Sequence, residues 1–196
     1  MVRAITLLGV LALLAVCSRA SESVRTDEVA GPFSWGAASN VTHVRHFWFS
    51  GQPDEDALEA ARGEGIGIVI NLREVHEHGW DEEQAVENLG MRYYSVPVPR
   101  KKPFPAAAFA QIEALVKDNE NEQILIHCST ANRAAGWFAT YLVAEHGMSL
   151  DDALAVGRKV GITKDAIAQS VANYLGEPAP VAAASPAAPP VEPLLE

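Results

Sequence analysis

The chain has 196 residues, of which 48% are hydrophobic, and its 15 Lys and Arg against 25 Asp and Glu give a formal net charge of −10. That length suits one domain with a sizeable core and leaves little room for a second. The acidic balance repels nucleic acid, and the short basic run Arg100-Lys101-Lys102 is too small to reverse it, so we expect no nucleic-acid partner.

The first twenty residues have the pattern of a signal peptide. Arg3 precedes an apolar run over residues 4–16, and the small residues Ser18 and Ala20 stand at the spacing of a signal peptidase site. We therefore expect export, periplasmic or secreted, with cleavage after Ala20. The alternative is a bacterial lipoprotein, in which a lipid on Cys17 would be the chain's only link to a membrane.

The two ends of the remaining chain differ from its middle. Residues 21–38 mix charges with Gly, Ser and Pro without a sustained period, and we interpret them as a linker. Residues 177–196 consist largely of Pro and Ala, which cannot build a core, and we expect a disordered tail there. The folded domain is therefore predicted over residues 39–176.

Strand and helix patterns alternate through this domain. Short apolar or β-branched runs predict strands over residues 47–51, 65–72, 91–98 and 123–128. Apolar residues at helical spacing, with acids at several starts and glycines at several ends, predict helices over residues 53–65, 81–90, 105–120, 133–146, 150–159 and 164–175. Strands separated by helices indicate an α/β fold with a mostly parallel central sheet flanked by helices.

The stretch "QILIHCSTANRAAG", residues 123–136, leads from a buried strand through a polar loop into a helix. In a parallel sheet such a loop borders the ligand crevice, and the N–H groups of the helix N-terminus point into it. Cys128 stands at the mouth of the loop and Arg133 at the start of the helix. Both the helix and the guanidinium favour a thiolate, and the guanidinium can hold two phosphate oxygens.

Cysteine usage supports a chemical role for this thiol. Removal of the signal peptide or acylation of Cys17 leaves Cys128 as the only free thiol, so no internal disulfide can form. A lone thiol in an oxidising compartment risks intermolecular pairing, which favours retention for chemistry over retention as a small buried hydrophobe.

The segment "HCSTANRAAG" resembles the phosphate loop of the cysteine-dependent tyrosine and dual-specificity phosphatases. It is more similar to the phosphatase-like domain of the bacterial beta-lactamase-hydrolase-like family, which has the same Cys-x4-Arg spacing. The likeness extends over about residues 45–170 and includes "FSGQPDEDALEAARGEGIGIVINLRE" and "LDDALAVGRKVGIT". It implies a three-layer sandwich like that of the dual-specificity phosphatases.

The resemblance also implies a role for each residue of the loop. Cys128 would be the nucleophile that forms a cysteinyl-phosphate, Arg133 would clamp the phosphoryl oxygens, and His127 would support the loop from behind. The phosphate would be bound by the loop residues Ser129, Thr130, Ala131, Asn132 and Arg133. No metal or other cofactor is implied, and the substrate would be a phosphorylated small molecule or protein, with protein phosphotyrosine among the possibilities.

The chain departs from the phosphatase pattern at the positions that handle protons and shape the loop. Ala131 stands where glycine is common, and Ala134 replaces a hydroxyl residue. If position 131 requires a positive φ, alanine is strained there. The stretch 96–105, where the general acid of such enzymes would lie, contains no carboxylate.

A substitute acid can come from "REVHEHGWDEEQ", which follows a predicted strand. The candidates are Asp81, Glu82, His76 and His78, and we favour Asp81. The alternative is a solvated loop leading into a helix whose acids suit its N-terminus.

Two further residues of that stretch allow more than one interpretation. Glu74 alternates with His76 and His78, which could form a metal site but lacks a fixed spacing to another ligand. Arg73, at the end of the strand, either meets substrate phosphate or forms a surface ion pair.

Three functions therefore compete. The first is an exported cysteine-dependent phosphatase that hydrolyses phosphomonoesters. The second is a weak or inactive module that binds phosphate or other oxyanions, which the missing acid, Ala131 and Ala134 would explain. The third is a sulfurtransferase, since rhodaneses also carry a cysteine in a loop after a strand, although the Arg133 and His127 neighbours favour phosphate.

Overall fold

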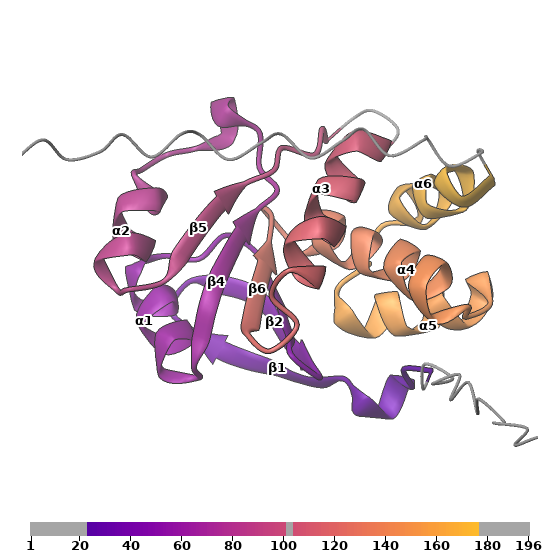
Figure 1. The fold of residues 1–196 in the computed structure, drawn as a ribbon, viewed down its shortest axis with the longest axis horizontal. Coiled ribbons are helices and arrows are strands. Elements are labelled where there is room, and N and C mark those ends of the chain that lie inside the picture. The colour runs from indigo at the N-terminus through magenta and orange to yellow at the C-terminus, as the bar shows by residue number, and fades with distance from the viewer. Residues whose placement is uncertain (1–22, 101–103, 177–196) are drawn as a thin grey trace, which may run out of the picture.

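The computed structural model describes residues 23–100 and 104–176 (Figure 1). The predicted signal peptide, Lys101, Lys102 and the predicted tail over residues 177–196 lie outside the described residues. No helix in the described part of the chain combines the length and the apolar character needed to cross a membrane.

Six strands form one mixed sheet in the order β1-β2-β3-β6-β4-β5. The strands are β1 (Ala30–Trp35), β2 (Ala38–Val44), β3 (Phe47–Ser50), β4 (Ile66–Asn71), β5 (Arg92–Ser95) and β6 (Gln123–His127). The last four of these, β3 to β6, pair in parallel, whereas β1 and β2 run antiparallel at one edge. The prediction of an α/β fold with a mostly parallel sheet is confirmed.

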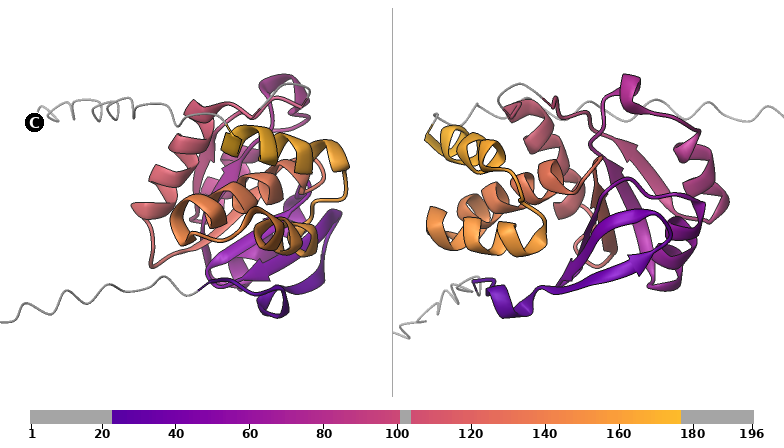
Figure 2. Two further views of the ribbon diagram at one scale, coloured as in Figure 1. Left: turned by 90° about the vertical axis from the view of Figure 1, so that its right-hand side faces the viewer. Right: turned by 180° about the vertical axis from the view of Figure 1, so that it is seen from behind.

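The predicted linker over residues 21–38 contains ordered elements where the structure describes it. A short 3-10 helix, η1 (Thr26–Glu28), precedes β1, and β1 pairs with β2 along the sheet edge (Figure 2, seen from behind). The linker interpretation was wrong for β1. The first five residues of β1 are exposed, so its ladder to β2 holds it in place and no apolar period marks it in the sequence.

Helices cover both faces of the sheet and make three layers (Figure 1). The sheet separates two hydrophobic cores. Helices α1 and α2 contribute to the core on one face, and α3 to α6 contribute to the core on the other. The helices are α1 (Glu55–Gly63), α2 (Glu82–Asn88), α3 (Ala106–Lys117), α4 (Asn132–His146), α5 (Leu150–Val160) and α6 (Asp165–Gly176), and a 3-10 turn, η2 (Val75–Glu77), follows β4. All six helices lie where the sequence predicts them, within a few residues at each end.

Polar side chains fix the starts of three helices. Asp54 accepts a hydrogen bond from Ala57 N at 3.0 Å in α1, and Ser149 accepts one from Asp152 N at 3.1 Å in α5. Asp81 does the same for α2, accepting from Gln84 N at 3.1 Å. Such caps satisfy N–H groups that the first helical turn leaves without partners.

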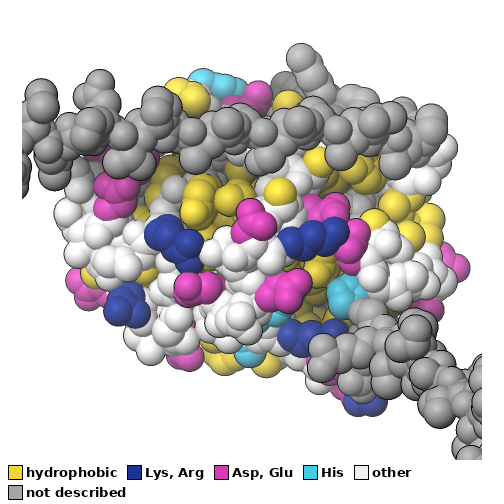
Figure 3. All heavy atoms as spheres, in the orientation of Figure 1, with side chains coloured by type: hydrophobic (Ala, Val, Ile, Leu, Met, Phe, Trp, Pro, Cys, Tyr) yellow, Lys and Arg dark blue, Asp and Glu magenta, His cyan; other side chains and the backbone are white. Residues whose placement is uncertain are grey.

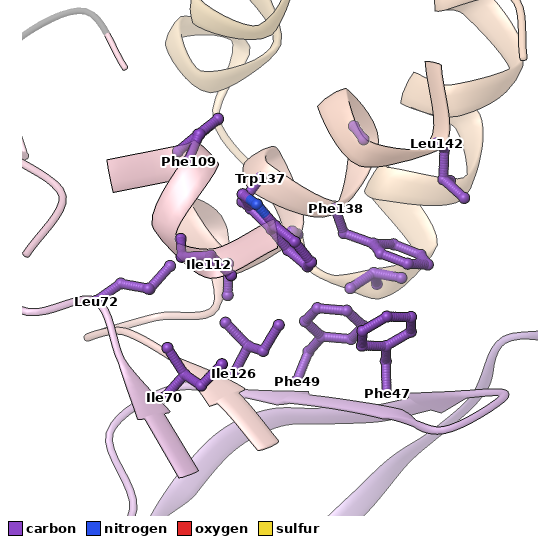
Figure 4. Packing of buried hydrophobic residues seen from close by; sticks show 14 of the residues in the cluster. Phe47, Phe49, Ile70, Leu72, Phe109, Ile112, Ile126, Trp137, Phe138 and Leu142 are labelled. Atoms are coloured by element: carbon purple, nitrogen blue, oxygen red, sulfur yellow. The ribbon is translucent and has the colours of Figure 1, made fainter. Parts of the chain in front are cut away.

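The aromatic residues of β3 anchor two separate cores because alternate side chains point to opposite faces of a sheet. Phe47 and Phe49 face the aromatic side chains of α4, Trp137 and Phe138 (Figure 4). Trp48 faces the other way and stacks on Trp35 of β1, with ring centroids 4.7 Å apart. This packing holds β3, β6 and α4 rigidly together, and the loop between β6 and α4 carries Cys128.

Candidate active site

Cys128 lies at the carboxyl end of β6, in the loop that opens α4. Its side chain is buried and borders a cavity of about 110 Å³. The other residues that line this cavity are Arg100, Ser129, Thr130, Asn132, Arg133, Lys164, Ala166 and Ile167. No side chain in the described part of the chain caps α4, so the N–H groups of its first turn are open to an anion.

Ala131 takes the left-handed conformation at the N-cap of α4, with φ of 65° and ψ of −18°. The condition raised from the sequence therefore holds, since this φ is positive, and the strain for a residue with a Cβ is roughly 1–2 kcal/mol. The turn after α5 lies directly behind it, because a Cβ added at Gly161 would stand 2.8 Å from the Ala131 Cβ. Packing from that turn therefore helps to hold the strained loop.

Arg133 is fixed by a carboxylate that the sequence interpretation missed. Its Nη1 donates to Glu77 Oε2 at 2.7 Å and its Nη2 donates to Glu77 Oε1 at 2.9 Å, a bidentate pair. The same nitrogens donate to the carbonyl oxygens of Leu72 and Val98 and to Ser129 Oγ. Five acceptors thus surround two Nη groups that carry four hydrogens, which leaves Nε–H as the remaining donor of the guanidinium.

The surroundings of Glu77 and Arg133 stabilise the charged form of each side chain. Burial raises the pKa of Glu77, but hydrogen bonds from Arg133, from Glu74 N and from Ser129 outweigh it and lower that pKa from 4.5 to about 2. Burial lowers the pKa of Arg133, while its hydrogen bond to Glu77 and the negative charge of Cys128 raise it above the ordinary value. Both groups are charged at neutral pH, and the Glu77 carboxylate occupies the part of the guanidinium that a phosphate would otherwise bind.

His127 points to the opposite face of the sheet from Cys128, since the two residues are consecutive in an extended segment. There its Nε2 lies 2.6 Å from Oε1 of Glu82, and both side chains are almost fully buried. Burial raises the pKa of Glu82, but His127, Gln52 and Arg73 lower it below the ordinary value. This buried contact joins β6 to α2 directly behind the loop that carries Cys128.

Arg73 belongs to the same buried network and does not line the cavity. Its Nη1 donates to Gln52 Oε1 and lies 3.9 Å from Glu82 Oε2. Asn71 Nδ2 also donates to Glu82 Oε2, at 3.2 Å. The structure shows an ion pair for Arg73, but a buried one and not the surface pair considered from the sequence; contact with substrate phosphate stays a prediction.

Asn132 joins the phosphate loop to the turn between α5 and α6. Its Oδ1 accepts hydrogen bonds from Thr163 N at 2.9 Å and from Lys164 N at 3.2 Å, and its Nδ2 donates to Thr130 Oγ1 at 3.3 Å. From the sequence, Asn132 was expected among the phosphate-binding residues of the loop, and that role stays a prediction. No sequence signal links it to residues 31 positions later, because the contact depends on how α4 and α5 pack.

The remaining candidates lie away from Cys128. Asp81 is exposed, caps α2 and is not among the residues that line the cavity, so its role as general acid stays a prediction. Among Glu74, His76 and His78, only Glu74 reaches the site region, where its Oε2 accepts from Arg100 N at 3.4 Å. Within residues 23–100 and 104–176, no three His, Cys, Asp or Glu side chains are grouped so that they could hold a metal ion.

Comparison with known proteins bears on the fold. No protein-family model matches the chain, and no curated protein matches it. Tk-PTP in its active form matches with a TM-score of 0.58 at 23% identity, over 72% of this chain and 97% of that one. The core catalytic domain of the PP-IP phosphatase SIW14 from S. cerevisiae, in complex with citrate, has a TM-score of 0.60 at 17% identity, over 72% and 88%.

A DUF442 protein from Shewanella putrefaciens CN-32 is also similar, with a TM-score of 0.55 at 20% identity, over 70% of this chain and 91% of that one. At these identities the likeness concerns the fold. The chain therefore has the α/β fold of the cysteine-dependent tyrosine and dual-specificity phosphatases, as its phosphate-loop resemblance predicts.

Proposed function

We propose that this protein is a cysteine-dependent phosphatase that hydrolyses phosphomonoesters. The observation that carries the proposal is the meeting of Cys128, Arg133 and the open N-terminus of α4 around one small cavity at the carboxyl end of β6. The proposal extends to membership in the beta-lactamase-hydrolase-like phosphatase family, supported by the Cys-x4-Arg loop and the fold shared with the DUF442 structure.

In the proposed reaction, the Cys128 thiolate attacks phosphorus and the bond from phosphorus to the leaving oxygen breaks. The α4 amides and Arg133 stabilise the charge that develops on the phosphoryl oxygens. Water then attacks the cysteinyl-phosphate, releases inorganic phosphate and returns the thiolate. We assign no general acid from the geometry, so the fastest substrates should be those whose leaving group departs without a proton.

The same proposal places the protein outside the cytoplasm. The pattern over residues 1–20 supports export with cleavage after Ala20, and Cys17 supports the lipoprotein alternative.

A second candidate function, an oxyanion-binding module without turnover, is favoured by one observation. Both Nη groups of Arg133 already donate hydrogen bonds to the Glu77 carboxylate. A phosphate would therefore have to share the guanidinium with that carboxylate or displace it. The strained Ala131 and the apolar Ala134 point in the same direction.

Hydrolysis of para-nitrophenyl phosphate by residues 21–196 between pH 4.5 and pH 8 distinguishes the two functions. We expect activity in the wild type and its loss in Cys128→Ser. Arg133→Lys keeps the charge but not the fork, and we expect it to lose most of the activity while remaining folded. No turnover, with phosphate or orthovanadate still raising the melting temperature, would establish the binding module, and a persulfide on Cys128 after thiosulfate treatment would favour the sulfurtransferase.

A further inference from the structure

The cavity at Cys128 is lined by three basic side chains. Its lining contains Arg100, Arg133 and Lys164 and no carboxylate among the described residues. The chain as a whole has a net charge of −10, and Figure 3 shows acidic and basic side chains interspersed on one face of the molecule. Three cations without an acid in so small a lining therefore stand out from the surrounding surface.

Lys164 is held close to the phosphate loop by its backbone. Its N–H donates to Asn132 Oδ1 at 3.2 Å, beside the stronger bond from Thr163 N. Asn132 is buried in the loop itself, so the position of Lys164 relative to Cys128 is fixed. The Lys164 ammonium forms no ion pair or hydrogen bond within the described residues, and its flexible stem leaves it free to reach over the cavity.

Arg100 contributes a further positive charge to the lining of the cavity. Its Nε lies 3.6 Å from Glu77 Oε1, a long contact, and its side chain is 60% exposed. Glu77 is already neutralised by its two short hydrogen bonds from Arg133. The Arg133–Glu77 pair has no net charge, so Arg100 and Lys164 together outweigh the Cys128 thiolate of the proposed reaction and leave the cavity with one surplus positive charge.

The lining offers little to an aromatic substrate. Its apolar side chains are Ala166 and Ile167, and no described residue of the lining has an aromatic ring. A phosphotyrosyl side chain would gain stability mainly from burying its ring against apolar walls. A second anionic group on the substrate would instead gain charge-assisted hydrogen bonds from Lys164 and Arg100.

We propose that the cavity takes a compact phosphate ester that carries a second anionic group, a phosphate or a carboxylate, close to the scissile phosphate. The loop from Cys128 to Arg133 holds the scissile phosphate, and Lys164 and Arg100 hold the second anion. This inference rests on the proposed phosphatase function and adds the substrate class.

Steady-state kinetics on two substrates test the proposal. The measured quantity is kcat/KM for fructose 1,6-bisphosphate divided by kcat/KM for para-nitrophenyl phosphate. We expect Lys164→Gln and Arg100→Gln each to lower this ratio about ten-fold, the loss of one charged hydrogen bond. Lys159→Gln removes the same charge from an exposed position of α5 outside the cavity, and we expect no change in the ratio.

Two outcomes overturn the inference while leaving the phosphatase function intact. One is a ratio that does not change in Lys164→Gln and Arg100→Gln, and the other is a wild-type preference for a phosphotyrosine peptide over the bisphosphate. If the wild type hydrolyses nothing, the phosphatase proposal fails, and calorimetry then decides on the site alone. Tighter binding of the bisphosphate than of inorganic phosphate, lost in Lys164→Gln, supports a two-anion site, and equal binding contradicts it.

Discussion

The Glu77 carboxylate is a built-in anionic partner for Arg133, at the start of α4. The carboxylate takes two hydrogen bonds from Arg133 and one from Ser129 Oγ, and the side chain is only 7% exposed. A phosphate that enters the cavity therefore meets a guanidinium that is already oriented but also partly occupied. The same contact can pre-organise the loop and limit its affinity for oxyanions.

The interaction of Glu77 with Arg133 should make the stability difference between the wild type and Glu77→Gln depend on pH. The pKa of Glu77 falls from 4.5 to about 2 on folding, so its contribution is fully present above about pH 4.5 and is lost as pH falls through about 2. We expect Glu77→Gln to lower the free energy of unfolding by about 3 kcal/mol at pH 7. Urea denaturation of both proteins from pH 7 towards pH 2 should show the difference shrinking. Glu59→Gln, an exposed change on α1, is the control, and a difference that stays constant with pH would contradict the assignment.

At the residue scale, local chemistry was predictable and long-range pairing was not. The positions of Cys128 and Arg133 follow from the loop between a strand and a helix, and the strain at Ala131 follows from its place in that loop. The pairing of Glu77 with Arg133 depends on a 3-10 turn that brings together residues 56 positions apart. A local signal for that turn exists, because Glu74 N–H donates to Glu77 Oε2 in an E-x-x-E capping pattern.

At the scale of elements, the pair between Glu82 and His127 joins α2 to β6 on the face opposite the nucleophile. Glu82 was considered from the sequence as a substitute acid. The structure instead surrounds it with Gln52, Asn71 and His127, and with Arg73 slightly farther away, so its carboxylate is held in the charged form.

We expect Glu82→Gln to destabilise the protein by about 3–5 kcal/mol, because Glu82 is the anionic member of a buried ion pair with Arg73 and its removal leaves that guanidinium without compensation. Chemical denaturation at pH 7 measures this. Glu83→Gln, the exposed neighbour in α2, should change stability by less than about 0.5 kcal/mol. Equal effects of the two substitutions would show that the buried pair contributes nothing specific.

The turn between α5 and α6 presses on the phosphate loop, which gives a second test at this scale. We expect Gly161→Ala to cost about 1–3 kcal/mol, since its Cβ would stand 2.8 Å from the Ala131 Cβ and overpack the contact. Activity on para-nitrophenyl phosphate should fall with it, as the loop moves. Gly63→Ala, at the end of α1 with no atom within 4 Å of the new Cβ, should leave the melting temperature and the activity nearly unchanged.

Helices and strands were predicted correctly where the sequence has a strong apolar pattern. The helices and the central parallel strands carry apolar patterns, because each of them buries one face or both. Strand β1 is exposed over five of its six residues, so its pairing with β2 leaves no trace in hydropathy. Its hydrogen-bonded ladder to β2, together with the stacking of Trp35 on Trp48, places it in the sheet.

For the whole molecule, the predicted export can be tested by mass. Cleavage after Ala20 would remove Arg3 and Arg19 and no acid, leaving 13 basic against 25 acidic residues and a net charge of −12. We expect the full chain, made in a bacterial host, to be recovered from the periplasm with Ser21 at its N-terminus. Cys17→Ser separates the alternatives, because it leaves such cleavage unaffected but abolishes membrane anchoring of a lipoprotein. Cytoplasmic protein that still begins at Met1 would contradict both.

The order of strands also sets the order in which the molecule can assemble. β6 is synthesised last of the strands, yet it lies between β3 and β4 in the sheet. A chain that lacks it would hold β1-β2-β3 and β4-β5 as two separate pieces, each with an unpaired central edge able to capture strands of other chains. Because His127 ends β6 and Cys128 follows it, the step that joins the two pieces also places Cys128. A partly assembled chain would therefore lack the ordered loop at Cys128 and be prone to aggregate, and no folded species would have the complete sheet without the loop.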